Sequence, residues 1–264
     1  MTTPPTFTTL KIVVEERIAI LEFARPNNLN ALSRQCLSEL VIASTWLGQQ
    51  SEVRVVIVRG QGRAFCAGFD LNDFATADQN ISLHASADLG RLATEALTNI
   101  SQVTIAVVHG HCVGGGGVVL AGACDLRVAS DDARFSIPEV DLGIPLAWGG
   151  IPRLVREIGP TATRELVLTC RPFDAHEAKQ LRFVNTVVAR ADLETHVDDL
   201  ARALAAKSAL VLQVTKAAVN QATEEMLSTA GAVGDADKLV AATHDAESRA
   251  AGASYIAGRK RNPR

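Results

Sequence analysis

The chain has 264 residues, of which 47% are hydrophobic and 21% are charged, and its formal net charge is −3 at pH 7. This composition supports a sizeable buried core and excludes a disordered chain. The charge gives no electrostatic basis for binding nucleic acid, because such proteins carry a basic patch or stripe and the only basic run here is residues 259–261. The most apolar stretch, residues 113–124, is shorter than the roughly 20 residues of a membrane span. We therefore expect a soluble protein that binds neither nucleic acid nor membrane.

The cysteines indicate a reducing compartment. There are five of them, widely spaced and without a CxxC pair. This pattern is typical of reduced thiols that pack as small hydrophobic side chains. Residues 1–10 contain no charged segment followed by an apolar run, so no signal peptide is predicted. The sequence therefore predicts a cytoplasmic location.

Strands and helices alternate from the start of the chain. Residues 12–14 and 18–23 predict a hairpin of two strands. Ser33 is the predicted N-cap of a helix, in which apolar residues follow at helical spacing as far as Leu47. The fully apolar run at residues 55–58 is typical of a strand buried in a parallel sheet.

The same order of elements then repeats. A helix is predicted near residues 88–101, followed by a buried strand at residues 104–108. A glycine-rich loop, an apolar helical segment and another strand at residues 125–129 come next. Alternating strands and helices predict an α/β fold with a largely parallel sheet.

The C-terminal part of the chain has a different pattern. After residue 188 the sequence predicts helices, with alanine-rich runs and only one short strand-like run at residues 209–214. We therefore expect a core over residues 1–195 and a helical region over residues 196–264.

Two loops rich in small residues follow neighbouring predicted strands. Residues 63–71 form the first loop, and Gly114–Gly117 form the second, which opens an apolar helix. Glycines at a helix N-terminus leave bare N–H groups, and the helix dipole adds positive potential there. Two such loops could direct their amides at one oxygen, as in an oxyanion hole. The alternative is that the glycines only allow a helix and a strand to pack closely.

Four short motifs occur in a fixed order along the chain. They are Arg25-Pro26 with Asn30-Ala31-Leu32; Ala64 to Leu71; Gly110 with Gly115-Gly116-Gly117 and Cys124-Asp125; and Phe135 with Pro138-Glu139, Gly149-Gly150 and Arg153-Leu154. In this order and spacing the motifs resemble the enoyl-CoA hydratase/isomerase, or crotonase, family over nearly the whole chain.

The resemblance implies a spiral of ββα units, and a helical C-terminal region that builds a homotrimer or a dimer of trimers. It implies an acyl-CoA substrate, with coenzyme A as part of the substrate and no metal or redox cofactor. Two backbone amides, those of Phe69 and Gly116, would bind the thioester oxygen. The family usually has three glycines in the second loop and this chain has four. Counting forward from Gly110 therefore gives Gly115 instead. We prefer Gly116, on the expectation that the loop absorbs the extra residue.

Hydratases of this family use two glutamates, and this chain matches one of them. The second glutamate corresponds to Glu139, whereas the first falls at Val119, or at Val118 in the other register. Neither valine transfers a proton, so the resemblance leaves Glu139 as the single acid and base. Family members with one glutamate at this position are Δ3,Δ2-enoyl-CoA isomerases. The dehalogenase branch needs an aspartate where this chain has Ala147, which excludes that reaction.

Further substrate contacts are expected from Arg63, Ala67, Asp70, Leu71, Gly115 and Trp148. Arg63 and the basic residues 259–261 would meet the phosphates of coenzyme A. Trp148 stands where hydratases have a small residue near the bound water. It would exclude water if it points inward, and pack between subunits if it points outward. Asp141 and His84 are two more titratable candidates near the site, and a surface position is favoured for each.

The expected function is thus that of an acyl-CoA enzyme of the hydratase or isomerase type. Two alternatives stay open. One is a catalytically silent acyl-CoA binder, which Val119 and Trp148 would explain. The other is a different crotonase reaction, such as decarboxylation or C–C cleavage, which needs the enolate-binding amides but fewer acids.

Overall fold

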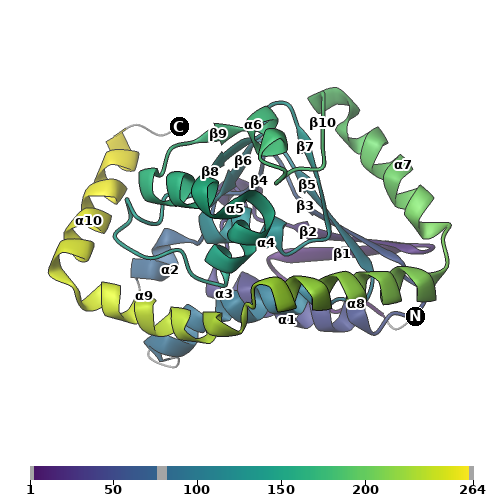
Figure 1. Cartoon of the computed structure of the whole chain (residues 1–264), viewed down its shortest axis with the longest axis horizontal. Coiled ribbons are helices and arrows are strands. Elements are labelled where there is room, and N and C mark those ends of the chain that lie inside the picture. The colour runs from purple at the N-terminus through teal and green to yellow at the C-terminus, as the bar shows by residue number, and fades with distance from the viewer. Residues whose placement is uncertain (1–2, 76–81, 262–264) are drawn as a thin grey trace.

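The structure is a computed structural model that describes residues 3–75 and 82–261. Two sheets form its centre, and helices surround them (Figure 1). Within the described residues, the larger sheet has the order β1 (Leu10–Glu15), β2 (Ile18–Phe23), β3 (Val55–Gly60), β5 (Val103–Val108), β7 (Leu126–Ser130) and β10 (Thr186–Val188). The smaller sheet has the order β4 (Ala64–Cys66), β6 (His111–Val113), β8 (Arg134–Ser136) and β9 (Phe173–Asp174).

The pairing of the strands confirms the predicted α/β fold. β1 and β2 form the expected antiparallel hairpin. Every other neighbouring pair in the larger sheet is parallel. The predicted strands at residues 55–58 and 104–108 are the central strands β3 and β5, whose side chains are almost all buried.

Consecutive strands alternate between the two sheets. β3, β5 and β7 lie in the larger sheet, whereas β4, β6 and β8, which follow them in the chain, lie in the smaller one. Helical segments follow each pair: α2 (Leu71–Ala75) with α3 (Leu83–Thr98), η2 (Gly115–Val119) with α4 (Leu120–Gly122), and α5 (Gly150–Thr169). This is the predicted spiral of ββα units. The sequence does not predict β4, β6 or β8, because a strand of three residues is too short for a visible alternation.

Side-chain caps set where two helices begin. The predicted N-cap Ser33 accepts a hydrogen bond from the Cys36 N–H at 3.2 Å, and α1 (Arg34–Gly48) follows it. α3 begins earlier than the predicted residue 88, because Ser82 caps it by accepting from the Ala85 N–H at 3.1 Å. The strand prediction at residues 209–214 is wrong. That run opens α8 (Ala209–Met226), where helix-favouring residues follow it.

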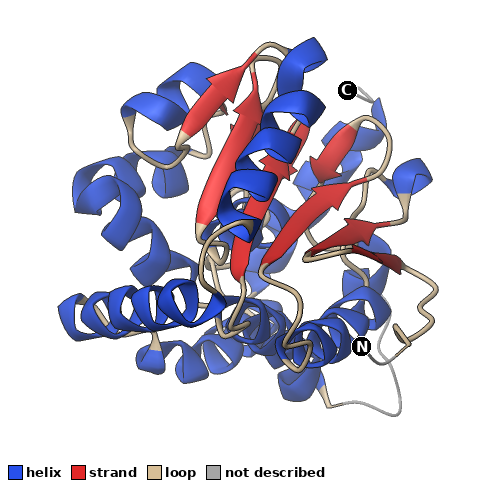
Figure 2. Cartoon of the chain, turned by 90° about the vertical axis from the view of Figure 1, so that its right-hand side faces the viewer, coloured by secondary structure: helices blue, strands red, loops and turns tan. Residues whose placement is uncertain are grey.

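Helices cover both faces of the larger sheet. α7 (Leu193–Ala205) lies across one face, where Leu193 and Val197 pack with Val55 and Ile105 (Figure 2). α1 and α3 contribute to the main core on the other face. The remaining helical segments are η1 (Pro26–Asn28), α6 (Ala175–Gln180), η3 (Arg190–Asp192), η4 (Ala230–Gly234), α9 (Asp235–His244) and α10 (Ala246–Arg261). No helix of the described residues has the length and hydropathy of a membrane span. The division of the chain near residue 195 stays a prediction.

Candidate active site

The glycine-rich loop enters its helix through an unusual turn. η2 is a π-helical turn, and α4 continues directly from it. A π turn accommodates one residue more than an α turn, and such turns are frequent at functional sites. The π turn gives the extra glycine a possible place inside the helix, and the choice between Gly115 and Gly116 stays a prediction.

This turn gives Gly115 and Gly116 different surroundings. Gly115 lines a cavity, and its N–H donates a hydrogen bond to Glu139 Oε1 at 2.7 Å. Gly116 is buried against the first loop, since a Cβ there would lie only 2.6 Å from the carbonyl carbon of Gly68. Gly116 thus permits the close approach of the two loops, and Gly115 presents the amide to the cavity.

The first loop is held by Leu32. The Leu32 N–H donates to the Gly68 carbonyl oxygen and the Asp70 N–H donates to the Leu32 carbonyl oxygen, both at 2.9 Å. Because backbone groups of successive residues in an extended chain point to opposite sides, the Phe69 N–H is directed away from Leu32. The glycine-rich turn packs closely on the same loop, because a Cβ at Gly116 would lie 2.6 Å from the Gly68 carbonyl carbon. Phe69 and Gly115 line the same cavity, so the two predicted loops do converge.

Glu139 lies between these loops and is buried, with 8% of its surface exposed. Its Oε2 atom has no hydrogen-bond partner among the residues that the structure describes. Burial raises the pKa of Glu139 to about 7, and the hydrogen bond from Gly115 offsets part of that effect. A carboxyl group with a pKa near neutrality can both accept and donate a proton.

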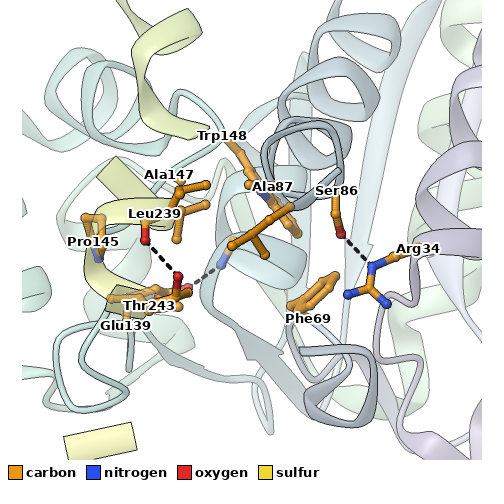
Figure 3. A pocket seen from close by; sticks show the side chains of 14 residues that line it. Arg34, Phe69, Ser86, Ala87, Glu139, Pro145, Ala147, Trp148, Leu239 and Thr243 are labelled. Atoms are coloured by element: carbon orange, nitrogen blue, oxygen red, sulfur yellow. Dashed lines mark hydrogen bonds between the residues drawn. The ribbon is translucent and has the colours of Figure 1, made fainter. Parts of the chain in front are cut away.

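Two cavities share Glu139 as a wall. The first has a volume of about 100 Å³ and is lined mainly by apolar groups, among them Phe69, Ala147 and Trp148, with α9 closing one side (Figure 3). The second has a volume of about 60 Å³ and contains the predicted substrate-binding residues Ala67 and Leu71. Of the described residues that line either cavity, only Glu139 carries a carboxyl group.

Trp148 points inward. Its indole is buried at 8% exposure and lies edge-on to the Phe69 ring, with 6.0 Å between the ring centroids. It also packs on Gly115, since a Cβ there would lie 3.0 Å from the indole Cε3. Of the two predicted orientations the structure shows the inward one, and the indole forms part of the cavity wall.

Three other candidates lie outside the cavities. Asp70 forms an ion pair with Arg25 at 2.8 Å and accepts a hydrogen bond from the Asn72 N–H, and these contacts stabilise the first loop. Asp141 is exposed, and His84 lies at the surface 3.3 Å from Asp237. These positions agree with a surface location for Asp141 and His84.

The predicted phosphate contacts lie at the surface or outside the described side chains. The Arg63 residue is exposed. The side chains of residues 259–261 are not among those described. Val118 and Val119, at the position of the first glutamate, are buried apolar residues. No three His, Cys, Asp or Glu side chains in the described ranges gather in a way that could hold a metal ion.

Sequence reasoning missed the polar side of the first cavity. Arg34 and Ser86 both line it, and Arg34 Nε donates to Ser86 Oγ at 2.5 Å (Figure 3). Arg34 is the first residue of α1, and Ser86 lies in the first turn of α3. Neither belongs to a recognisable motif. Their meeting depends on the contact between two helices, which the sequence pattern does not reveal.

The fold and the cavity define a class of protein: an α/β protein in which two loops and a buried glutamate line one apolar cavity, with a backbone amide of one loop hydrogen-bonded to that glutamate. A family model described as "Enoyl-CoA hydratase/isomerase" matches residues 14–263. A probable enoyl-CoA hydratase of Mycobacterium bovis is 36% identical over 225 residues, covering 84% of this chain and 85% of the relative. A peroxisomal Delta(3,5)-Delta(2,4)-dienoyl-CoA isomerase of Arabidopsis thaliana is 36% identical over 239 residues, with coverage of 84% and 85%.

A solved structure supports the same conclusion for the fold. The crystal structure of an enoyl-CoA hydratase from Mycobacterium avium subsp. paratuberculosis superposes with a TM-score of 0.86 at 22% identity, covering 95% of this chain and 99% of the other. The chain therefore belongs to the enoyl-CoA hydratase/isomerase family and has the crotonase fold.

Proposed function

We propose that this enzyme binds an acyl-CoA thioester, stabilises its enolate with the amides of Phe69 and Gly115, and moves a proton with Glu139. The observation that carries the proposal is the hydrogen bond of 2.7 Å between the Gly115 N–H and Glu139 Oε1. It supports the view that this amide is accessible to an oxygen acceptor inside the cavity. The same hydrogen bond favours Gly115 over Gly116 as the second donor.

The thioester oxygen would compete with Glu139 Oε1 for the Gly115 amide. In the proposed complex the thioester oxygen takes that donor, which frees the carboxylate to act on the acyl chain. Charge that develops on the thioester oxygen is then stabilised by two fixed N–H groups, a contribution of about 3 kcal/mol per donor. The second cavity, which contains Ala67 and Leu71, is the proposed path of the coenzyme A arm.

A single carboxyl group favours isomerisation. Glu139 would take a proton from C2 of a 3-enoyl thioester, leaving a dienolate whose charge rests on the thioester oxygen. It would then return that proton to C4, giving the 2-enoyl thioester with no change in composition. The pKa of Glu139, raised to about 7 by burial, suits a group that must accept and donate the same proton.

Hydration is the second candidate, because a relative that is 36% identical is a probable enoyl-CoA hydratase. Two features weigh against it. Val118 and Val119 supply no second acid to hold the water, and the Trp148 indole forms part of the cavity wall.

The test is turnover of a panel of 2-enoyl-CoA and 3-enoyl-CoA substrates by the natural chain and by Glu139→Gln. We expect isomerisation of 3-enoyl-CoA, lowered about 1,000-fold in the variant, because the amide cannot exchange a proton. Asp141→Asn is the matched control, since it removes an exposed carboxyl group two residues away. Undiminished turnover in Glu139→Gln would overturn the single-acid mechanism. Binding of acyl-CoA without any turnover by the natural chain would establish the silent binder instead.

We further propose that the chain forms a homotrimer or a dimer of trimers. α8 leaves several apolar side chains exposed, among them Leu210, Val211 and Val214, and such a patch is typical of an interface between subunits. Light scattering at the working concentration measures the assembly. Arg63 and residues 259–261 as phosphate contacts, and the cytoplasmic location, stay predictions from the sequence.

A further inference from the structure

The indole of Trp148 occupies a slot between two glycines. On one side is Gly115; on the other is Gly90, in the middle of α3, where a Cβ would lie 1.8 Å from the indole Cε2. The ring therefore rests directly on the backbone of the helix. Neither glycine can gain a side chain unless the indole moves.

Two local costs accompany this placement. Glycine inside a helix costs about 1 kcal/mol relative to alanine, and Gly90 lies inside α3. Trp148 itself adopts a left-handed backbone conformation, with φ of 62°, which is costly for a residue with a side chain. The Thr94 hydroxyl, one turn after Gly90, lies 3.2 Å from the Trp148 carbonyl oxygen, which is one of three carbonyl acceptors within reach of its hydrogen. Because the Trp148 side chain is kept in place despite these two conformational costs, we looked for its role at the cavity that it borders.

The cavity beside the indole is small. Its volume of about 100 Å³ is less than that of an apolar cavity of roughly 150 Å³ that holds one benzene molecule. It therefore has room beside Glu139 for only a short segment of an acyl chain. Phe69 and Trp148 form adjoining walls, and Leu83 and Leu239 add apolar surface from α3 and α9.

We propose that Trp148, seated on Gly90, is the residue that restricts this enzyme to short acyl-CoA thioesters. The inference rests on the proposed function, because it assumes that the acyl chain enters the cavity next to Glu139. It adds the substrate class, short acyl groups, and the side chain that selects it. Removing the indole would join its volume to the cavity and admit longer chains.

The experiment measures the affinity of saturated acyl-CoAs, from butanoyl to decanoyl, by calorimetry, so that it needs no turnover. For Trp148→Ala we expect the affinity for octanoyl-CoA relative to butanoyl-CoA to rise about 100-fold, since four more methylene groups are buried. Trp46→Ala, which removes the other tryptophan from α1, is the matched control and should leave the ratio unchanged. An unchanged ratio in a folded Trp148→Ala would overturn the proposal.

Gly90→Ala tests the slot from the opposite side. The added methyl group should push the indole into the cavity and weaken butanoyl-CoA binding at least tenfold. The double variant Gly90→Ala/Trp148→Ala should bind octanoyl-CoA as well as Trp148→Ala does, because without the indole the added methyl group has nothing to clash with. A Gly90→Ala chain that binds butanoyl-CoA normally would contradict the slot. If the natural chain turns over no enoyl-CoA but the chain-length series behaves as expected, the proposed chemistry fails and the role of Trp148 stands.

Discussion

Two buried glutamates in this molecule, Glu39 and Glu139, have very different hydrogen-bonding partners. Glu39 and Glu139 are each 8% exposed. Glu39 lies in α1 and accepts hydrogen bonds from the backbone and hydroxyl groups of Thr8 and Thr9, at 2.5–3.2 Å, and from Gln35. Glu139 accepts one from Gly115, and its second oxygen has no partner among the described residues.

The pKa values of the two groups diverge accordingly. Burial by itself would raise the pKa of Glu39, but the hydrogen bonds from Thr9 and Thr8 outweigh it and hold that pKa below its ordinary value. Burial raises the pKa of Glu139 to about 7, because a single donor does not replace lost water. Both side chains are little exposed, but Glu139 is the more deeply buried of the two, so the depth of burial and the number of hydrogen-bond donors together move the two pKa values in opposite directions.

The largest difference we expect is in stability. Glu39→Gln should lower the free energy of unfolding by about 4 kcal/mol, because the amide loses several charge-assisted hydrogen bonds and turns an N–H₂ group toward the Thr8 and Thr9 donors. Glu139→Gln should cost less than about 1 kcal/mol at neutral pH, since it removes a charge that is poorly solvated. Urea unfolding of both variants measures the contrast. Equal losses would show that Glu139 is held as firmly as Glu39.

For catalytic turnover we expect the opposite order, with a large loss in Glu139→Gln and almost none in Glu39→Gln. Glu39→Gln should keep the catalytic rate of the natural chain at temperatures where it is folded, because α1 places this side chain against Thr8 and Thr9 and not in either cavity. If Glu39→Gln loses activity only because less of the protein is folded, the result agrees with this expectation. A lower catalytic rate per folded molecule would contradict it.

The next effect is in the pH dependence of stability. The pKa of Glu139 is about 7 in the folded chain against an ordinary value of 4.5, so the unfolded chain releases this proton first as the pH rises. The stability due to Glu139 is complete below pH 4.5 and falls by about 3 kcal/mol as the pH rises to about 7. Unfolding of the natural chain and of Glu139→Gln at about pH 5 and about pH 8 measures it. Compared with the natural chain, Glu139→Gln should be more stable at about pH 8 than it is at about pH 5.

The stability due to Glu39 should change with pH in the opposite direction in the same unfolding experiment. Because its pKa is lowered in the folded chain, its stabilisation is present above its ordinary value of 4.5 and is lost as the pH falls through the folded pKa. The difference between the natural chain and Glu39→Gln should therefore shrink toward acid pH. Parallel pH curves for the two variants would mean that donors do not distinguish the two sites.

The sequence revealed one of these glutamates and not the other. Glu139 belongs to a motif that resembles a family, so its position could be predicted. The bonding of Glu39 depends on Thr8 and Thr9, which precede a strand and carry no motif. Long apolar strands such as β3 and β5 were predictable from their pattern, whereas the three-residue strands of the smaller sheet were not.

The details of the site depended on contacts between distant parts of the chain. The proposal of Gly115 in place of Gly116 draws on a π turn and on the hydrogen bond from Gly115 to Glu139, and neither feature is visible in the sequence. The inward orientation of Trp148 depends on Gly90, which is far away in the sequence and adjacent in space. Family resemblance singled out Glu139, and only the fold could show which amide donates to it and which residues surround it.

The smallest predicted effect makes Glu39 more like Glu139. Thr9→Val removes the hydroxyl that donates to Glu39 Oε2 at 2.5 Å and keeps the backbone donor of the same residue at 2.9 Å. We expect the pKa of Glu39 to rise and the chain to lose about 1 kcal/mol of stability, because one of several hydrogen bonds to the charge is lost. Carboxyl-carbon NMR titration follows the pKa directly. Thr45→Val is the control, since the Thr45 hydroxyl donates only to the Val41 carbonyl oxygen within the exposed part of α1. If the pKa of Glu39 stayed constant in Thr9→Val, the backbone donors alone would be sufficient to keep this carboxyl group ionised, and hydroxyl groups would not be part of the distinction from Glu139.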